Sequence, residues 1–164
     1  MSAAVDTNFL LDLAEPGDDA WDAFETLQTR ARHLPLIAPP TVVHELVYVS
    51  EHKHSPPLRR AARKVLRSMA RTWNIHAVQL SPVQHGIAAQ VGDRLRRVGL
   101  LPEEERNDSY ILAESALLNS VLLITSDNVL RRIDFARLTY ELRHFDLPVP
   151  IIITPKEIIR KFFR

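Results

Sequence analysis

Residues 107–127 read NDSYILAESALLNSVLLITSD, and this stretch decides the fold. Asn107 is a favoured N-cap residue, and the positive end of a helix dipole stabilises Asp108 in the first turn. Residues 111–117 then place apolar and small side chains at helical spacing, which predicts a helix packed closely on a sheet. Residues 121–124 are continuously apolar, as in a strand buried on both faces of a parallel sheet, and Asp127 follows at the carboxyl end of that strand.

A second strand of the same design begins the chain. Residues 3–5 are apolar, and Asp6 follows them. The carboxyl edge of an open α/β sheet is where ligands bind, so we expect Asp6 and Asp127 to open onto one crevice. Carboxylates that lie close together repel when ionised, and a bound cation removes that cost. The pattern therefore suggests a divalent metal.

The composition narrows the class of protein. The chain has 164 residues, of which 46% are hydrophobic and 25% charged, and we expect one globular domain over residues 1–164. It has no cysteine, which excludes disulfides, zinc-thiolate sites and cysteine nucleophiles and is compatible with a reducing cytoplasm. No signal-peptide pattern and no run near the roughly 20 apolar residues of a membrane span is present, so we expect a cytoplasmic protein without a membrane partner. The net charge of +1 means that any basic surface must be local.

The remaining chain alternates predicted helices and strands, which favours a three-layer α/β fold with a mainly parallel central sheet. Asp18, Thr41, Ser55 and Ser81 are the predicted helix N-caps, and Gly99 is placed to end the helix that Ser81 opens. Helices are expected over 7–13, 18–34, 42–52, 56–72, 82–98, 135–142 and 156–163, and residues 129–133 fit a short helix or a turn. Strands are expected at 36–38 and 149–153, and residues 75–80 fit either a strand or an extended connection.

Four carboxylates make the candidate catalytic and metal site: Asp6, Glu45, Asp108 and Asp127. Glu45 lies on an apolar helical face rather than opposite it. Hard oxygen ligands suit Mg2+ or Mn2+, and two such ions roughly 4 Å apart can activate water and stabilise the leaving oxygen of a phosphodiester. The simpler interpretation is that the aspartates are ordinary helix caps and Glu45 a boundary residue. Supporting roles for a ligand, a metal-bound water or a phosphate fall to Asn8, Thr125 and Ser126.

Candidate RNA contacts come from two groups of arginines. Arg59, Arg63 and Arg67 are spaced at i, i+4 and i+8, a helical stripe that could follow a phosphate backbone or simply be a solvated face. Arg131 and Arg132 lie near the last aspartate in sequence and are alternative phosphate contacts.

Four short motifs carry a family resemblance. VDTNFLLDL, HELVY, NDSYILAES and LLITSDNVL occur in the order and spacing seen in PIN domains, and the chain resembles PIN-domain ribonucleases, in particular VapC-type toxins of toxin–antitoxin pairs. The resemblance implies an α/β/α fold and a metal-dependent endoribonuclease whose acids fall on Asp6, Glu45, Asp108 and Asp127. It also implies 5'-phosphate and 3'-hydroxyl products, a homodimer and a cognate antitoxin. Many PIN domains carry a further aspartate where this chain has Val129.

Other classes fit less well. Haloacid-dehalogenase-like phosphotransferases need a second aspartate at the position of Asn8, and the four glycines of the chain form no phosphate loop. His44 and Glu45 form an HE pair, but no histidine follows four residues after His44, so the zinc-protease pattern is absent. We interpret His44, His52 and His54 as helix-surface residues, and Phe162 and Phe163 as core or dimer surface. A PIN-like module that binds RNA or protein without cutting remains the alternative function, and a metal titration separates the two.

Overall fold

The fold is seen in a computed structural model, which describes residues 1–15 and 17–162. Five strands form one all-parallel sheet in the order β3-β2-β1-β4-β5. The strands are β1 (Ser2–Val5), β2 (Leu36–Ala38), β3 (Ile75–Ala77), β4 (Ser120–Ile124) and β5 (Ile151–Ile153). The chain runs outward from β1 to β3 and then returns to the other side of β1 for β4. The winding therefore reverses between β1 and β4, the kind of point where open α/β sheets bind ligands.

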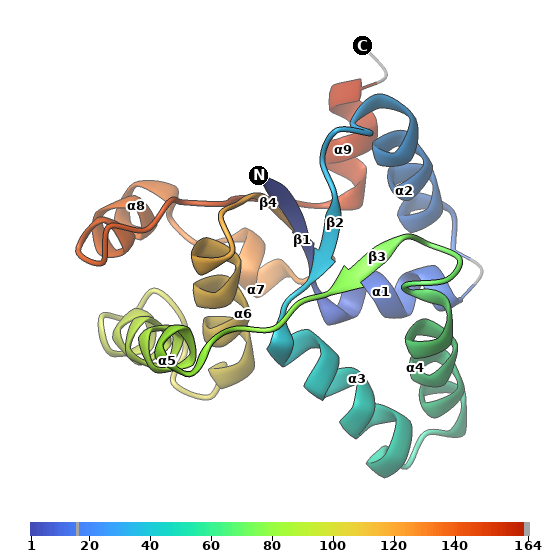
Figure 1. Ribbon diagram of the computed structural model, residues 1–164, viewed down its shortest axis with the longest axis horizontal. Coiled ribbons are helices and arrows are strands. Elements are labelled where there is room, and N and C mark those ends of the chain that lie inside the picture. Colours follow the sequence, from blue (N-terminus) through green and yellow to red (C-terminus); the bar gives the residue numbers. More distant parts are fainter. Residues whose placement is uncertain (16, 163–164) are drawn as a thin grey trace.

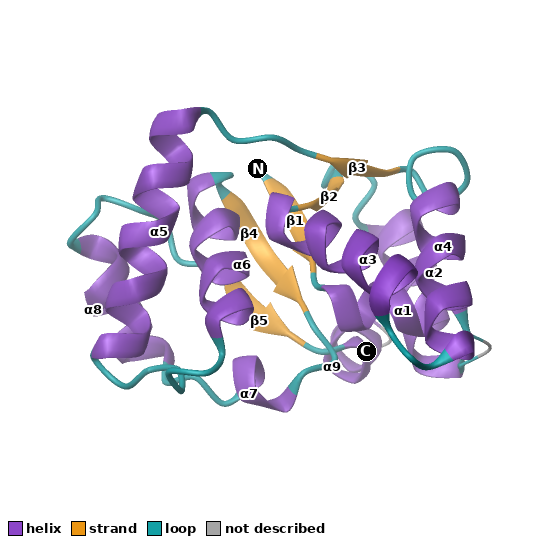
Figure 2. Ribbon diagram, turned by 90° about the horizontal axis from the view of Figure 1, so that it is seen from below, coloured by secondary structure: helices purple, strands orange, loops and turns teal. Residues whose placement is uncertain are grey.

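Helices cover both faces of this sheet (Figures 1 and 2), which confirms the three-layer α/β prediction. The helices on one face are α5 (Pro82–Arg97), α6 (Arg106–Leu117) and α8 (Phe135–Arg143). The helices on the other face are α1 (Thr7–Ala14), α2 (Asp18–Arg30), α3 (Pro40–His52), α4 (Pro56–Ser68) and α9 (Pro155–Phe162). The short helix α7 (Asn128–Arg131) follows β4. None of the helices in the described ranges is long and apolar enough to cross a membrane.

The core is centred on β1 and β4. Ala3, Ala4 and Val5 are completely buried, as are Leu123 and Ile124 in the neighbouring strand. Val5 pairs with Ile124, and the Asp6 amide continues the ladder by donating to the Ile124 carbonyl at 2.9 Å. The paired strands therefore end side by side, which fixes the backbone of the residues that follow them.

Two predicted caps are confirmed by side-chain hydrogen bonds. Ser81 and Gln84 form a reciprocal capping box at the start of α5, and Ser55 accepts from the Leu58 amide at 3.4 Å at the start of α4. Gly99 has a φ of 75°, the left-handed conformation that suits a residue following a helix.

Three other predicted N-caps are wrong. Asp18 and Thr41 lie within the first turns of α2 and α3, and α6 begins at Arg106 with Asn107 already inside it. The Asn107 and Thr41 side chains instead bond acids on other helices, so tertiary contacts replace the local cap. The predicted ends also shift: α4 stops at Ser68, and the last strand covers only Ile151–Ile153. Phe163 lies outside the described residues.

Candidate acidic metal site

A cavity of about 780 Å³ lies at the carboxyl end of β1. Its lining comes from α1, α3 and the start of α6, with contributions from α4 and the chain just after α3. Three of the four predicted acids, Asp6, Glu45 and Asp108, face it. The fold thus brings together carboxylates that are separated by 39 and 63 positions in the sequence (45 − 6 and 108 − 45).

Asp6 is the most buried of these acids, with 2% of its surface exposed. Its Oδ1 accepts from the Thr7 amide at 2.7 Å, and its Oδ2 accepts from the Thr125 hydroxyl at 2.6 Å. Burial raises the pKa of Asp6 from its ordinary 3.8 to about 6, against the opposing effect of the Thr125 hydrogen bond. Nearby Glu45 and Asp127 raise the pKa further.

Thr125 links Asp6 to Asp127. The fully buried Thr125 hydroxyl accepts from the Asp127 amide at 2.9 Å while it donates to Asp6. Asp127 is half-buried, and its Oδ1 accepts from the Val129 amide at 2.7 Å, which caps α7. Asp127 is thus both a helix cap, as the simpler interpretation expected, and a member of the charged group around Asp6.

Glu45 is held from two sides. The Thr7 hydroxyl donates to its Oε2, and the Asn107 amide group donates to its Oε1 at 2.7 Å. Thr7 therefore contacts both Asp6 and Glu45, and Asn107 joins α3 to the start of α6. These two residues orient Glu45, although the sequence patterns did not assign either of them to the site.

The second oxygen of the Asp108 carboxylate, Oδ2, is buried and is not held by a hydrogen bond from any of the described residues. Burial raises the pKa of Asp108 from 3.8 to about 8, and the charges of Asp6 and Asp127 add to this effect. A buried carboxylate oxygen without a donor is costly, and the surrounding acids make it more so.

The chemistry of this group of acids fits a divalent cation. All its donors are hard oxygens, which suit Mg2+ or Mn2+, and a cation would satisfy the unpaired Asp108 oxygen. Within the described ranges, however, no three acidic, histidine or cysteine side chains are arranged as a ready metal centre. In the structure, hydrogen bonds already occupy oxygens of Asp6, Glu45 and Asp127.

The three residues predicted to support the acids, Asn8, Thr125 and Ser126, lie in different surroundings. Asn8 is exposed and lines the acidic cavity. Thr125 positions Asp6 and Asp127 as described above. Ser126 faces a second cavity of about 520 Å³, where its hydroxyl donates to Asp12 at 2.7 Å.

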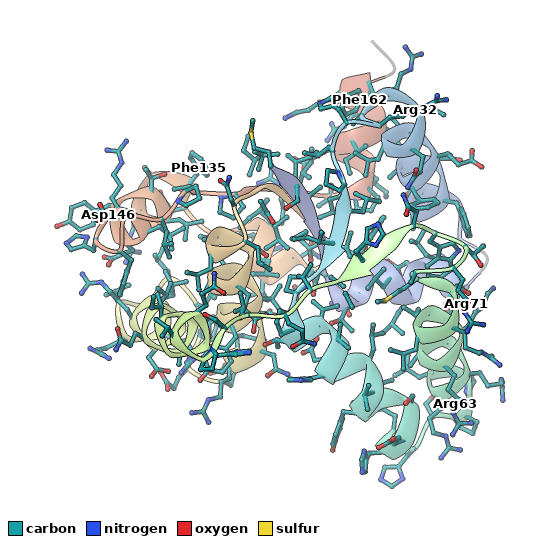
Figure 3. The ribbon with its side chains drawn as sticks, in the orientation of Figure 1. Arg32, Arg63, Arg71, Phe135, Asp146 and Phe162 are labelled. Carbon is teal, nitrogen blue, oxygen red and sulfur yellow. The ribbon has the colours of Figure 1, made fainter. Side chains whose placement is uncertain are left out.

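The candidate arginines lie outside the acid group. Arg63 and Arg67 are exposed on α4, where Figure 3 shows Arg63 at the margin of the molecule, and Arg59 is half-buried. Arg131 donates to Glu157 on α9 with Nε at 2.8 Å and with a second guanidinium nitrogen, while Arg132 is exposed. The Arg131 guanidinium is therefore already paired.

Glu114 is a site-supporting residue that sequence reasoning missed. It is 4% exposed on α6, and its carboxylate accepts from the Thr41 amide at 3.0 Å and the Thr41 hydroxyl at 2.7 Å. Pro39, the N-cap of α3, provides no side-chain cap, so Glu114 takes that role from another helix. Glu45 lies one turn after Thr41. The available signal was a single charge within the otherwise uncharged segment YILAESALL, residues 110–118.

We expect Glu114→Gln to destabilise the protein by about 1–3 kcal/mol, because the amide provides one acceptor where the carboxylate provides two charged ones. The melting temperature in thermal unfolding should fall by roughly 3–8 °C. Glu104→Gln, an exposed loop change, is the matched control. Equal melting temperatures for both variants would show that Glu114 does not clamp α3 to α6.

The fold and the cavity together define an α/β protein with an acidic cavity where its strand order reverses. The family model of the PIN domain matches residues 3–136, which include all four acids, and the chain belongs to the PIN-domain family. No curated protein sequence matches the chain significantly.

Two solved structures share the fold over nearly the full chain. One is the crystal structure of VapBC2 from Rickettsia felis bound to a DNA fragment from their promoter, with a TM-score of 0.62 and 15% identity, covering 94% of this chain and 98% of that chain. The other is VapBC-1 from nontypeable Haemophilus influenzae, with a TM-score of 0.56 and 13% identity, covering 95% and 99%. At this level of identity the likeness concerns the fold.

Proposed function

We propose that this protein is a metal-dependent endoribonuclease. The observation that carries the proposal is the buried, unpaired Asp108 Oδ2 in a cavity shared with Asp6 and Glu45. Membership of the PIN-domain family supports a hydrolase that acts on nucleic-acid phosphodiesters.

In this proposal Asp6, Asp108 and Asp127 hold Mg2+ or Mn2+, and Glu45 completes the set. When bound, the cation supplies positive charge for the phosphodiester and a more acidic water. Thr125 keeps Asp6 and Asp127 together, while Thr7 and Asn107 keep Glu45 beside them. The products would carry 5'-phosphate and 3'-hydroxyl ends, as the family resemblance implies.

The number of cations follows from the number of acids. Val129 occupies the position where many PIN domains have another aspartate, and Val129 here gives only its backbone amide to Asp127. Fewer carboxylates neutralise less cation charge, so we propose one tightly held ion and a weaker second one.

The biological role proposed is that of a cytoplasmic toxin, active as a homodimer and inhibited by a cognate antitoxin. Its support is the likeness in fold to chains of two VapBC structures. The antitoxin would cover the acidic cavity, and nothing in the chain identifies the RNA target.

We further propose that arginines on α4 contact the RNA backbone. Leu58 of α4 lines the acidic cavity, so the helix borders it, and Arg59 comes next in the chain. Reversing the charge of Arg59, Arg63 and Arg67 should weaken RNA binding and flatten its salt dependence. Unchanged affinity would identify the stripe as a solvated face.

The test is cleavage of end-labelled single-stranded and structured RNAs with Mg2+, with Mn2+ and with chelator. Wild-type protein should cut only with a divalent cation, and Asp6→Asn should not cut. If neither protein cuts any RNA and the wild type binds no metal, the protein is a non-catalytic PIN-like binding module.

A further inference from the structure

The outer face of α3 carries an aromatic stripe that the proposed chemistry does not use. His44, Tyr48 and His52 are spaced at i, i+4 and i+8, so they follow one another along the helix surface. Tyr48 is 59% exposed, and its ring stacks on that of His52, with centroids 4.7 Å apart and planes 19° from parallel. The Tyr48 ring is therefore open to a ligand on the side that His52 does not cover.

The stripe is continuous with the acidic cavity. His44 and Tyr48 line the same 780 Å³ cavity as Asp6, Glu45 and Asp108. Tyr48 follows Glu45 by three residues, which is about 4.5 Å along a helix axis and places the two side chains on neighbouring positions of the helix surface. The aromatic ring is therefore the neighbour of a proposed metal ligand.

The same cavity also holds a positive charge. Lys53, the residue that follows α3, is exposed and lines the cavity. Proteins bind unpaired nucleotides by stacking the base on an aromatic face and pairing the phosphate with a cation. Tyr48, with its face braced by His52, and Lys53 supply these two groups beside the acids.

We propose that Tyr48 is a stacking site for an unpaired base of the RNA substrate, one nucleotide from the cleaved phosphodiester, with Lys53 on the adjoining phosphate. This inference rests on the proposed ribonuclease function and adds to it a residue that contacts a base of the substrate. A base within a duplex cannot reach the ring, because both of its faces are already stacked on neighbouring bases.

The chain contains a matched control. Tyr140 on α8 and His144, the C-cap residue of that helix, have the same i, i+4 spacing, and Tyr140 is 63% exposed. Their rings meet edge-on, 69° from parallel, and neither residue lines the acidic cavity. Truncating Tyr140 therefore removes an equivalent exposed ring away from the proposed subsite.

The experiment measures the affinity of a single-stranded oligoribonucleotide by fluorescence anisotropy, with Mg2+ present and with all variants made in an Asp6→Asn background to prevent cutting. Tyr48→Ala should weaken binding about tenfold, within the range that one stacked base contributes. Tyr48→Phe and Tyr48→Trp should retain binding, and Tyr140→Ala should leave it unchanged. With an oligonucleotide that is abasic at the stacked position, Tyr48→Ala should cause no further loss of affinity, because the ring then has no base to contact.

Two results would overturn the inference while the ribonuclease proposal stands. One is equal RNA affinity for Tyr48→Ala and its parent, in protein whose wild-type form cuts RNA. The other is an equal loss on intact and abasic RNA, which would show that Tyr48 acts without contacting a base. A wild type that neither binds nor cuts RNA would instead overturn the proposed function itself.

Discussion

Asp108→Asn is expected to abolish RNA cleavage and, in the absence of metal, to make the protein more stable. Cleavage should fall by at least about 100-fold, the typical cost of removing one charged group from a preorganised site. Stability should rise because the substitution removes a negative charge from a buried position beside Asp6 and Asp127. The new amide can donate to one of these carboxylates, which the Asp108 carboxylate cannot do.

The gain in stability should depend on pH. Burial raises the pKa of Asp108 to about 8, so the carboxyl group is charged at pH 8.5 and protonated at pH 5. In chelator at pH 8.5 we expect a gain of roughly 1–3 kcal/mol, discounted for the partly exposed position, and a melting temperature higher by roughly 3–8 °C. At pH 5 the gain should be much smaller, and it should vanish only below about pH 4, where Asp108 is protonated in the unfolded chain as well.

Asp22→Asn, on the exposed face of α2, is the control for a generic change in charge. It should alter neither cleavage nor the pH dependence of unfolding. An Asp108→Asn protein that melts below the wild type in chelator at pH 8.5 would contradict the conclusion that this carboxylate is uncompensated.

The metal-free wild type is expected to lose stability as the pH rises from 5 to 8.5. The pKa values of Asp6 and Asp108 are raised to about 6 and about 8, from 3.8. Above pH 3.8 and below these raised pKa values, the folded state retains protons that the unfolded chain has released. The stabilisation is therefore complete below about pH 4 and is lost as the pH rises through 6 and 8. Burial also raises the pKa of Glu114, which adds to the decline.

Glu157 contributes to the pH dependence of stability with the opposite sign, but at a pH below the range from 5 to 8.5. Hydrogen bonds from Arg131 lower the pKa of Glu157 to about 2, so its stabilisation is present above about pH 4.5 and is lost only as the pH falls toward 2. Thermal unfolding from pH 5 to 8.5, with chelator and with Mg2+, measures the effect. Mg2+ should restore stability at pH 8.5 and have little effect at pH 5, because protonated acids do not bind it. A flat profile in chelator would show that these acids carry no uncompensated charge.

Local patterns were enough to predict the elements that carry the acids. The apolar runs before Asp6 and Asp127 predicted buried parallel strands, and the structure confirms both. The family resemblance is confirmed as well, since the chain belongs to the PIN-domain family. The metal, the RNA substrate and the catalytic roles of the four acids remain predictions.

The contacts between helices could not be predicted from local patterns. Asn107 fits a cap by local rules, but Glu45 lies 62 positions away in sequence and its carboxylate takes the Asn107 amide group. Glu114 and Thr41 are 73 positions apart, and only the packing of α3 on α6 brings them together. Each bond depends on how two helices meet, which the residues of one helix do not specify.

The different positions of the two side chains that follow β4 also were not predicted from the sequence. Thr125 and Ser126 both looked suitable to support a ligand, because each follows the strand with a hydroxyl group. Successive residues of an extended chain point to opposite sides. Thr125 therefore faces Asp6, whereas Ser126 faces Asp12 in the second cavity.

Calorimetric titration of the chelator-treated protein with Mn2+ tests most directly whether the acids form a cation site. We expect the wild type to bind Mn2+ near pH 7 and to release protons as it does so, because Asp108 must ionise. Asp108→Asn should bind at least about 10-fold more weakly without that proton release, and Asp22→Asn should match the wild type. Absence of Mn2+ binding to the wild type, or equal binding by Asp108→Asn, would show that these acids are not a metal site.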